Sequence, residues 1–273
     1  MGKVFISVKD INHTDYRWID TRFSLQDAKE GIQKYESGHV SEAVYWNLDT
    51  DLSDLTKKEG RHPMAEKDSL IELFRKTGLS INDKIAVYDD GGSPFAARAW
   101  WILQYAGFKN SYIVIEGFEA IKEAGLSVDA NTPNPKHSLV SPLWDEMIYA
   151  PRQFVEETVS GKTESILLDA RSAERYRGET EPIDPIAGRI PGAFNFDWEQ
   201  LKKDGLFNMD ESVKVAMETV VDPSKEVTVY CGSGVTAAPL YAMLAENGYE
   251  NIRLYVGSYS DWISKEGAKV EKD

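Results

Sequence analysis

The chain has 273 residues, which at about 150 residues per domain is long enough for two domains. Charged residues make up 28% and hydrophobic residues 42%, an ordinary globular composition that disfavours disorder. The formal net charge of −14 disfavours general binding to nucleic acids or to anionic membranes, because both need basic surfaces. The one cysteine, Cys231, excludes an intramolecular disulfide and a metal site built from several thiolates.

The first residues contain no apolar run long enough for a signal peptide, and Ile6 stands where a myristoylation motif requires Ser or Thr. No stretch approaches the ~18 consecutive apolar residues of a membrane helix. We therefore expect a soluble, cytoplasmic protein, because a reducing compartment suits a single free thiol.

Apolar spacing predicts elements that alternate along the chain. In the first half the pattern predicts a helix over 69–76, a strand over 85–88, a helix over 95–106 and a strand over 111–115. In the second half it predicts a strand over 166–169, a helix over 213–220, a strand over 226–230, a helix over 235–247 and a strand over 252–255. Strands that alternate with helices predict an α/β fold with mostly parallel sheets, in which ligands bind beyond the carboxyl ends of the strands.

The two halves resemble each other. Five short segments of the first half recur in the same order about 140 to 150 residues later. They begin at Trp18, Gly38, Ile85, Gly107 and Gly117, and recur from Leu167, Gly188, Val227, Gly248 and Gly257. The repeat predicts two tandem domains of one architecture; the alternative is two unrelated α/β domains that share generic strand and turn patterns.

The boundary between the copies falls in a segment rich in Pro and Asn near Pro133. We expect an N-terminal domain over 1–128, a linker over 129–150 and a C-terminal domain over 151–273. Trp144, Met147 and Tyr149 predict that the second half of the linker packs against the domains.

The lone cysteine follows the predicted strand 226–230 and opens the loop Cys231-Gly232-Ser233-Gly234-Val235-Thr236, after which a helix begins. The two glycines allow the loop to curl so that its N–H groups point inward as an anion site, and the helix start adds its positive dipole end. Such surroundings favour a reactive thiolate. The alternative is that Cys231 is a small buried hydrophobic residue.

In the first copy Asp89 stands where Cys231 stands in the second. A carboxylate cannot act as a thiol nucleophile, and it repels an anionic substrate. We therefore expect the first domain to be catalytically inactive, although it can contribute side chains across the interface.

Several motifs together resemble the tandem-domain rhodanese family, the sulfurtransferases that act on thiosulfate or 3-mercaptopyruvate. These motifs are Leu168-Asp169-Ala170-Arg171, Arg175-Tyr176-Arg177-Gly178, the stretch from Gly188 to Asn195, the Cys231 loop and the stretch from Gly257 to Trp262. The resemblance covers nearly the whole chain. It implies two rhodanese-like domains, each a mostly parallel sheet flanked by helices, with an inactive N-terminal and an active C-terminal copy.

The resemblance implies sulfur transfer by double displacement. The Cys231 thiolate takes the outer sulfur of a small anionic donor and becomes a persulfide, cradled by the loop residues Gly232, Gly234, Val235 and Thr236. A thiol, such as a thioredoxin-like or glutathione-like one, or cyanide then removes that sulfur. The family chemistry implies no metal and no organic cofactor.

The loop also bears on the donor. Members of the family that prefer thiosulfate typically carry basic residues after the cysteine, whereas Gly232 and Ser233 resemble the mercaptopyruvate type. In that type the loop serine is linked to a His and an Asp of the first domain in a proton relay, and His62 and Asp49 are the matching residues. The alternative is that His62 only caps or packs a loop.

Arg175 matches the arginine that holds the donor's carboxylate or sulfonate in this family, and a guanidinium suits such a group. The alternative for Arg175 is a surface ion pair, whereas Arg171 is expected to brace the domain. Two positions depart from the family pattern. Ile183 follows Glu181-Pro182, where the mercaptopyruvate type carries a second arginine, and Arg189 replaces the usual His of its motif.

Two other functions stay open. Cysteine-dependent phosphatases of a related fold need an arginine six positions after the cysteine, where this chain has Ala237, so a phosphoryl group would lack its clamp. A persulfide carrier or scaffold without efficient turnover of small donors is the other alternative, and an acidic surface could attract basic partners.

Overall fold

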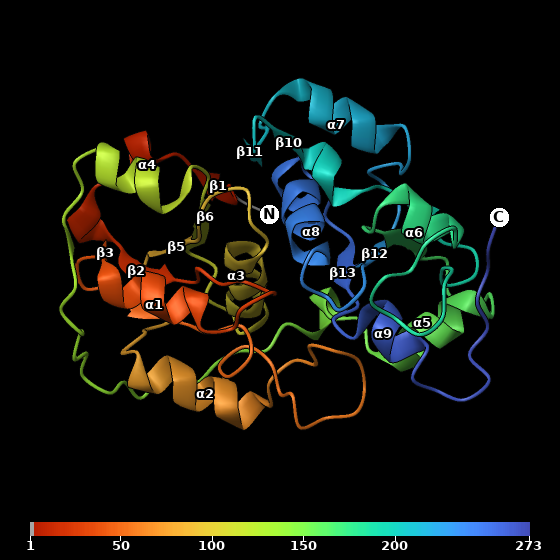
Figure 1. The fold of residues 1–273 in the computed structure, drawn as a ribbon, viewed down its shortest axis with the longest axis horizontal. Coiled ribbons are helices and arrows are strands. Elements are labelled where there is room, and N and C mark those ends of the chain that lie inside the picture. The colour runs from red at the N-terminus through yellow and green to blue at the C-terminus, as the bar shows by residue number, and fades with distance from the viewer. Residues whose placement is uncertain (1–2) are drawn as a thin grey trace.

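The computed structural model describes residues 3–273, in which two parallel sheets are each flanked by helices (Figure 1). The first half of the chain contains β1 (Phe5–Ile6), β2 (Arg17–Asp20), α1 (Glu30–Ser37), β3 (His39–Val40), β4 (Val44–Tyr45), α2 (Lys67–Lys76), β5 (Ile85–Tyr88), α3 (Phe95–Tyr105), β6 (Ser111–Val114), α4 (Gly117–Glu123) and β7 (Val128–Asp129). Short 3-10 turns lie at Val8–Asp10 and His13–Asp15.

The second half contains α5 (Arg152–Val159), β8 (Ile166–Asp169), α6 (Ala173–Arg177), β9 (Phe194–Asn195), β10 (Lys202–Lys203), β11 (Leu206–Phe207), α7 (Glu211–Glu218), β12 (Val227–Tyr230), α8 (Ala237–Glu246), β13 (Ile252–Leu254) and α9 (Ser258–Trp262). Further 3-10 turns lie at Glu146–Ile148 and Trp198–Leu201. The helices and strands predicted from apolar spacing are all present, with ends that differ by up to two residues.

The two sheets share one strand order. The first runs β1-β6-β5-β2-β4 and the second β13-β12-β8-β9, and every neighbouring pair in both is parallel. The first sheet has one more edge strand, β1, which pairs with β6. In the second sheet the end of the linker takes that place, because Tyr149 forms a parallel bridge with Leu254. The predicted α/β class with parallel sheets is therefore confirmed.

The second half of the linker packs only in part as predicted. Trp144 and Tyr149 lie against the core, and Tyr149 extends the second sheet. The expectation for Met147 is wrong, because its side chain is 67% exposed. Met147 lies in a single 3-10 turn, Glu146–Ile148, and this turn directs Ile148 rather than Met147 into the core.

One hydrophobic cluster spans both domains, and each domain has a further cluster of its own. Helices α3 and α8 are apolar on nearly every side because they pack on their own sheets and on each other, as Figure 1 shows at the centre of the molecule. The rings of Trp100 and Trp101 lie 6.2 and 6.4 Å from that of Tyr241. Arg98 is the one charged residue of α3, and it is fully buried in this contact.

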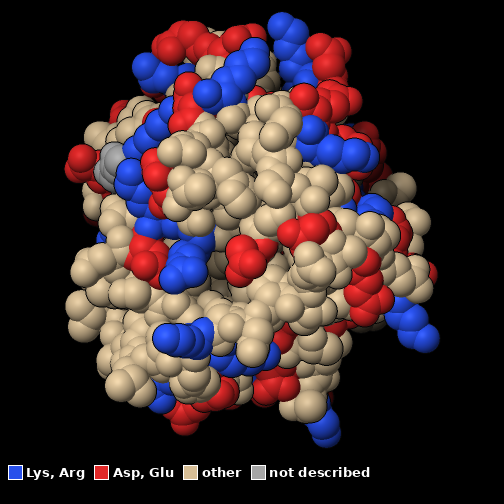
Figure 2. All heavy atoms as spheres, turned by 90° about the vertical axis from the view of Figure 1, so that its left-hand side faces the viewer, with Lys and Arg blue, Asp and Glu red and all other residues tan. Residues whose placement is uncertain are grey.

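The outer face of the N-terminal domain carries acidic and basic side chains that are interspersed among uncharged ones (Figure 2). Among residues 3–273, no helix is both long and apolar enough to cross a bilayer.

Candidate active site

The loop 231–236 begins where β12 ends and leads directly into α8. Cys231 is 1% exposed, and the backbone N–H of Gly234 donates to its Sγ at 3.1 Å. Gly234 has φ +77°, and a Cβ there would overlap the carbonyl oxygen of Val256, so the loop can take this path only with glycine. Within residues 3–273, the N–H groups of the other loop residues after the cysteine donate to no protein acceptor; they belong to Gly232, Ser233, Val235 and Thr236.

The stretch from Val256 to Trp262 holds the loop from the other side. The N–H of Tyr259 donates to the carbonyl oxygen of Cys231 at 3.0 Å, and that of Ser260 to the carbonyl oxygen of Gly232 at 2.9 Å. The Ser258 Oγ accepts the N–H of Cys231 at 3.0 Å. Ser258 has φ +57°, an uncommon conformation for a residue with a side chain. The nucleophile loop is thus fixed by the stretch that follows the carboxyl end of β13.

His62 reaches the loop from the first domain. Its Nδ1 lies 2.9 Å from the Oγ of Ser233, and its Nε2 lies 3.6 Å from the Oδ1 of Asp49. Burial, together with the positive charges of Arg98 and Arg61, lowers the pKa of His62 to about 4. The imidazole is therefore neutral at neutral pH and can accept the Ser233 hydroxyl proton at Nδ1. Burial also raises the pKa of Asp49.

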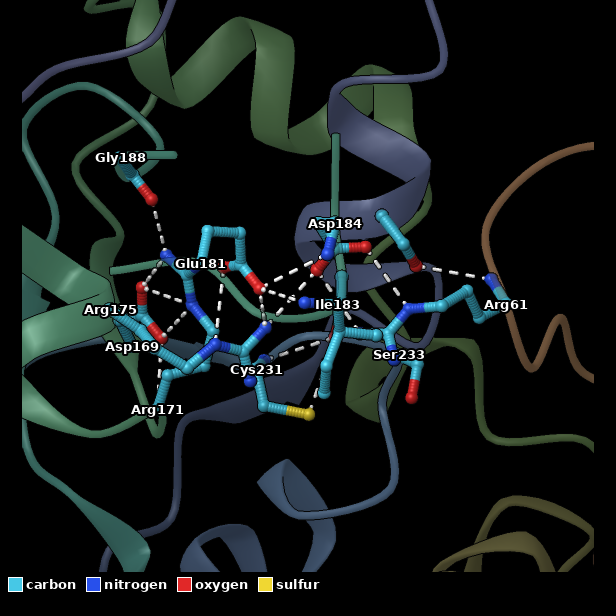
Figure 3. A network of polar contacts seen from close by, with 12 residues as sticks. Arg61, Asp169, Arg171, Arg175, Glu181, Ile183, Asp184, Gly188, Cys231 and Ser233 are labelled. Atoms are coloured by element: carbon cyan, nitrogen blue, oxygen red, sulfur yellow. Dashed lines mark hydrogen bonds and ion pairs between the residues drawn. The ribbon is translucent and has the colours of Figure 1, made fainter. Parts of the chain in front are cut away.

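Arg175, on the short helix α6, lies next to the loop and is held by two carboxylates (Figure 3). Its Nε and Nη2 donate to Glu181 at 3.1 and 2.7 Å, and its Nη2 also donates to Asp184 at 3.2 Å. A Cβ on Gly232 would lie 3.4 Å from its Nη2 and 3.6 Å from its Nη1. Arg175 is thus both an ion-paired residue and a neighbour of the loop.

Arg171 is buried behind this arrangement. It donates to Asp169, to Glu181 and to the carbonyl oxygen of Gly188. Its counterpart in the first domain, Arg22, makes the same bidentate pair with Asp20. Because the pair occurs in both domains, it supports the fold rather than one reaction.

Two arginines that motif comparison does not single out also lie at the loop. The Nη2 of Arg61 is 2.5 Å from the position of a Cβ on Gly232, and the Nη1 of Arg98 donates to the carbonyl oxygen of Gly234 at 3.3 Å. Both belong to the first domain. Arg61 directly precedes His62, a candidate site residue, and this neighbour could have pointed to it. Arg98 gives no such signal, because in the sequence it is only a single cation in an apolar helix.

In the corresponding loop of the first domain, an acidic side chain accepts the N–H groups. Asp89 is 2% exposed, and its carboxylate accepts the N–H groups of Gly91 at 2.8 Å and Ala96 at 2.9 Å. Burial raises the pKa of Asp89 to about 7, although these two hydrogen bonds oppose the shift. Its own side chain occupies the N–H groups that a substrate would need.

Among residues 3–273, no three or more His, Cys, Asp or Glu side chains are grouped so that they could hold a metal ion.

Comparison with known proteins identifies the family and the fold. The model of the rhodanese-like domain matches the chain twice, over residues 8–124 and 153–265. The protein therefore belongs to the rhodanese family, as a tandem-domain member, and the predicted resemblance is confirmed.

Two relatives cover most of the chain. A Mycobacterium tuberculosis protein, provisionally named a thiosulfate sulfurtransferase, is 37% identical over 90% of this chain and 87% of its own. A Pseudomonas aeruginosa protein, provisionally named a 3-mercaptopyruvate sulfurtransferase, is 34% identical over 93% of this chain and 91% of its own. Among solved structures, the 3-mercaptopyruvate sulfurtransferase of Leishmania major is similar with a TM-score of 0.83 and 28% identity, over 94% of this chain and 73% of that one.

Proposed function

We propose that this protein is a sulfurtransferase in which Cys231 carries the transferred sulfur as a persulfide. One observation carries the proposal: the Sγ of Cys231 lies in a loop whose Gly234 N–H already donates to it at 3.1 Å. The N–H groups of Gly232, Ser233, Val235 and Thr236 have no protein acceptor within residues 3–273. A persulfide extends one sulfur atom farther and can accept these donors as an anion. The named relatives support sulfur transfer as the activity.

The first displacement forms a bond between the Sγ of Cys231 and the outer sulfur of the donor. The bond that breaks joins that sulfur to carbon in 3-mercaptopyruvate or to the second sulfur in thiosulfate. Its electron pair leaves with the enolate of pyruvate or with sulfite, respectively. In the second displacement a thiolate or cyanide attacks the outer sulfur, and the Cys231 thiolate leaves.

3-Mercaptopyruvate is the donor that the site favours, because it carries a proton that must move. The thiol proton of this donor passes to Ser233 as the hydroxyl proton of Ser233 passes to Nδ1 of neutral His62. The imidazolium that forms faces the carboxylate of Asp49, 3.6 Å away, and the reverse movement protonates the enolate. Thiosulfate has no such proton and needs no relay. Ser233, His62 and Asp49 are therefore proposed to act in turnover of mercaptopyruvate.

The acceptor is proposed to be an external thiol, such as a thioredoxin-like or glutathione-like one, or cyanide. Because the chain has a single cysteine, it has no second thiol to resolve the persulfide. Such acceptors, and a lone unpaired thiol, fit the reducing conditions of the cytoplasm.

Intact-mass measurement after incubation with each donor tests the proposal. The wild-type chain should gain one sulfur atom and Cys231→Ser none, because a hydroxyl is a far weaker nucleophile. A chain that stays unmodified with both donors contradicts the mechanism.

A second measurement separates an enzyme from a carrier. Values of kcat/KM for thiosulfate and 3-mercaptopyruvate, measured with cyanide and no protein partner, should show turnover with the higher value for mercaptopyruvate. Stoichiometric loading without turnover would instead indicate a persulfide carrier.

A further inference from the structure

We propose that Ser260 is a positioning residue, which holds His62 of the N-terminal domain against Ser233 of the nucleophile loop. Motif comparison includes Ser260 in the stretch from Gly257 to Trp262 but gives it no role of its own. The contact rests on geometry. Its consequence for turnover rests on the proposed function, in which His62 and Ser233 move the proton of 3-mercaptopyruvate.

Ser260 binds both members of the relay through their neighbours in the chain. Its N–H donates to the carbonyl oxygen of Gly232, which precedes Ser233, at 2.9 Å. Its Oγ accepts the N–H of Arg61, which precedes His62, at 3.1 Å. Ser260 is buried at the contact of the two domains. One residue therefore sets the spacing of two segments whose reacting atoms, the Nδ1 of His62 and the Oγ of Ser233, lie 2.9 Å apart.

Few other polar contacts hold the His62 segment, residues 59–63, to the C-terminal domain. In the part of the chain that the structure describes, the bond from Arg61 to Ser260 is the one backbone hydrogen bond between this segment and that domain. The other polar links are the ion pair of the Arg61 side chain with Asp184 (Figure 3) and the contact of His62 with Ser233 itself. Because the long Arg61 side chain can follow a shift of its backbone, Ser260 is what fixes the backbone beside His62.

Gly60 allows the His62 segment to approach Ser260 closely. It has φ +79°, a conformation that residues with a side chain rarely adopt. A Cβ there would lie 3.1 Å from the carbonyl oxygen of Gly257, 3.2 Å from the Oγ of Ser260 and 3.3 Å from the Cβ of Asp261. All three distances are tight for a Cβ. A side chain at position 60 would therefore push the segment away from the C-terminal domain.

Loss of the Ser260 hydroxyl should disturb the relay and spare the nucleophile. In Ser260→Ala the backbone N–H still donates to Gly232, and Cys231 keeps its bonds to the residues around it. Only the acceptor of the Arg61 N–H is lost. Proton transfer needs heavy atoms about 2.6 to 3.2 Å apart, so a small shift of His62 interrupts it.

Rates with the two donors test the effect on turnover. Ser260→Ala should lower kcat/KM for 3-mercaptopyruvate about tenfold, the order expected for loss of one hydrogen bond, and change that for thiosulfate less than about twofold. The matched control is Ser264→Ala. The Ser264 hydroxyl donates to the carbonyl oxygen of Asp261 and accepts the Nη1 of Arg152, both in the C-terminal domain. Its loss should leave both values unchanged.

NMR titration of the His62 ring reports its position without turnover. In the wild type, burial and the positive charges of Arg98 and Arg61 lower the pKa of His62 to about 4. A segment that moves away from the C-terminal domain exposes the ring, so the pKa should rise in Ser260→Ala toward that of an ordinary histidine. In Ser264→Ala the pKa should stay at the wild-type value.

A pair of glycine variants probes the same contact from the N-terminal domain. Gly60→Ala should raise the pKa of His62 and lower kcat/KM for mercaptopyruvate more than for thiosulfate, because the new Cβ pushes the segment away. Gly125→Ala is its control. Gly125 lies in the same domain with φ +80°, but a Cβ there meets nothing within 4 Å. This variant adds the backbone strain without the collision and should change neither quantity. Thermal unfolding verifies that each variant is folded.

A His62 pKa that stays at the wild-type value in Ser260→Ala overturns the inference, even if Gly60→Ala responds. If Ser233→Ala discriminates between the donors, equal losses or no loss in Ser260→Ala overturn it as well. If Ser233→Ala does not discriminate but the pKa rises in Ser260→Ala, the proposed relay fails while Ser260 keeps its positioning role.

Discussion

Arg98 and Cys231 belong to different domains, and hydrogen bonds to a single residue of the nucleophile loop, Gly234, connect them. The Nη1 of Arg98 donates to the carbonyl oxygen of Gly234 at 3.3 Å, and the N–H of Gly234 donates to the Sγ of Cys231 at 3.1 Å. The Nη2 of Arg98 donates to the carbonyl oxygen of His62 at 3.4 Å. Burial lowers the pKa of Arg98 to about 10, and negative charge on Cys231 opposes this shift. A buried cation without a carboxylate partner among residues 3–273 is thus linked through Gly234 to the group that becomes an anion.

Replacing Arg98 by Met should slow alkylation of Cys231 by neutral iodoacetamide about tenfold at neutral pH, because the thiolate loses a nearby cation of roughly 1.4 kcal/mol influence. Arg98→Lys should keep most of the rate because it keeps the charge. The rates are measured by intact mass on variants whose thermal unfolding shows a folded protein. Equal rates in all three proteins would leave Arg98 a purely structural role.

Ser233→Ala should reduce kcat/KM for 3-mercaptopyruvate at least tenfold more than for thiosulfate, because only the first donor needs a proton moved. Steady-state rates with both donors check this. His62→Gln should show the same selectivity, since its Nδ1 is the acceptor for Ser233. Equal losses for the two donors would argue against a proton relay.

His62 should titrate near pH 4, well below an ordinary histidine, because burial and then Arg98 and Arg61 disfavour its charged form. Its folded-state pKa is below the unfolded value, so stability from the neutral form is present above about pH 6.5 and is lost as the pH falls toward 4. NMR of the histidine rings measures this, with His62→Gln to assign the signal. Arg61→Gln should move the midpoint upward; a midpoint near 6.5 in the wild type would contradict the burial argument.

Asp89 should make the protein less stable as the pH rises from about 4 to 7. Burial raises its folded-state pKa to about 7, so the folded chain holds a proton that the unfolded chain releases across that window. Chemical denaturation at pH 5 and pH 8 of the wild type and Asp89→Asn isolates the effect. The variant should gain stability relative to the wild type at the higher pH, and a constant difference between the two pH values would refute it.

Much of the fold could be predicted from the sequence because its signals are local. The apolar runs before Asp89 and before Cys231 predict strands, and the repeat predicts that both end at one type of loop. The contacts of Arg61, Arg98 and Asp184 could not be predicted in this way. These contacts depend on how the two domains dock. The spacing of residues within one domain does not indicate which loop of the other domain it contacts.

The linker shows the same limit on a smaller scale. Tyr149 packs as its aromatic side chain suggests, whereas Met147 faces solvent because one 3-10 turn decides which of two apolar residues points inward. His62 illustrates the opposite case. Only the resemblance to a family predicts its proximity to Ser233, because composition and periodicity do not distinguish it from an ordinary loop histidine.

The first domain lacks the nucleophile but contributes side chains to the site of the second domain. The copy that has Asp89 in place of a nucleophile still places Asp49, His62, Arg61 and Arg98 around the loop of the other copy. The N-terminal domain thus serves the C-terminal domain as a permanently bound subunit would. Any movement that separates the domains takes His62, the proposed base, and the guanidinium groups of Arg61 and Arg98 away from the loop at once. Cys231 would then remain without these groups.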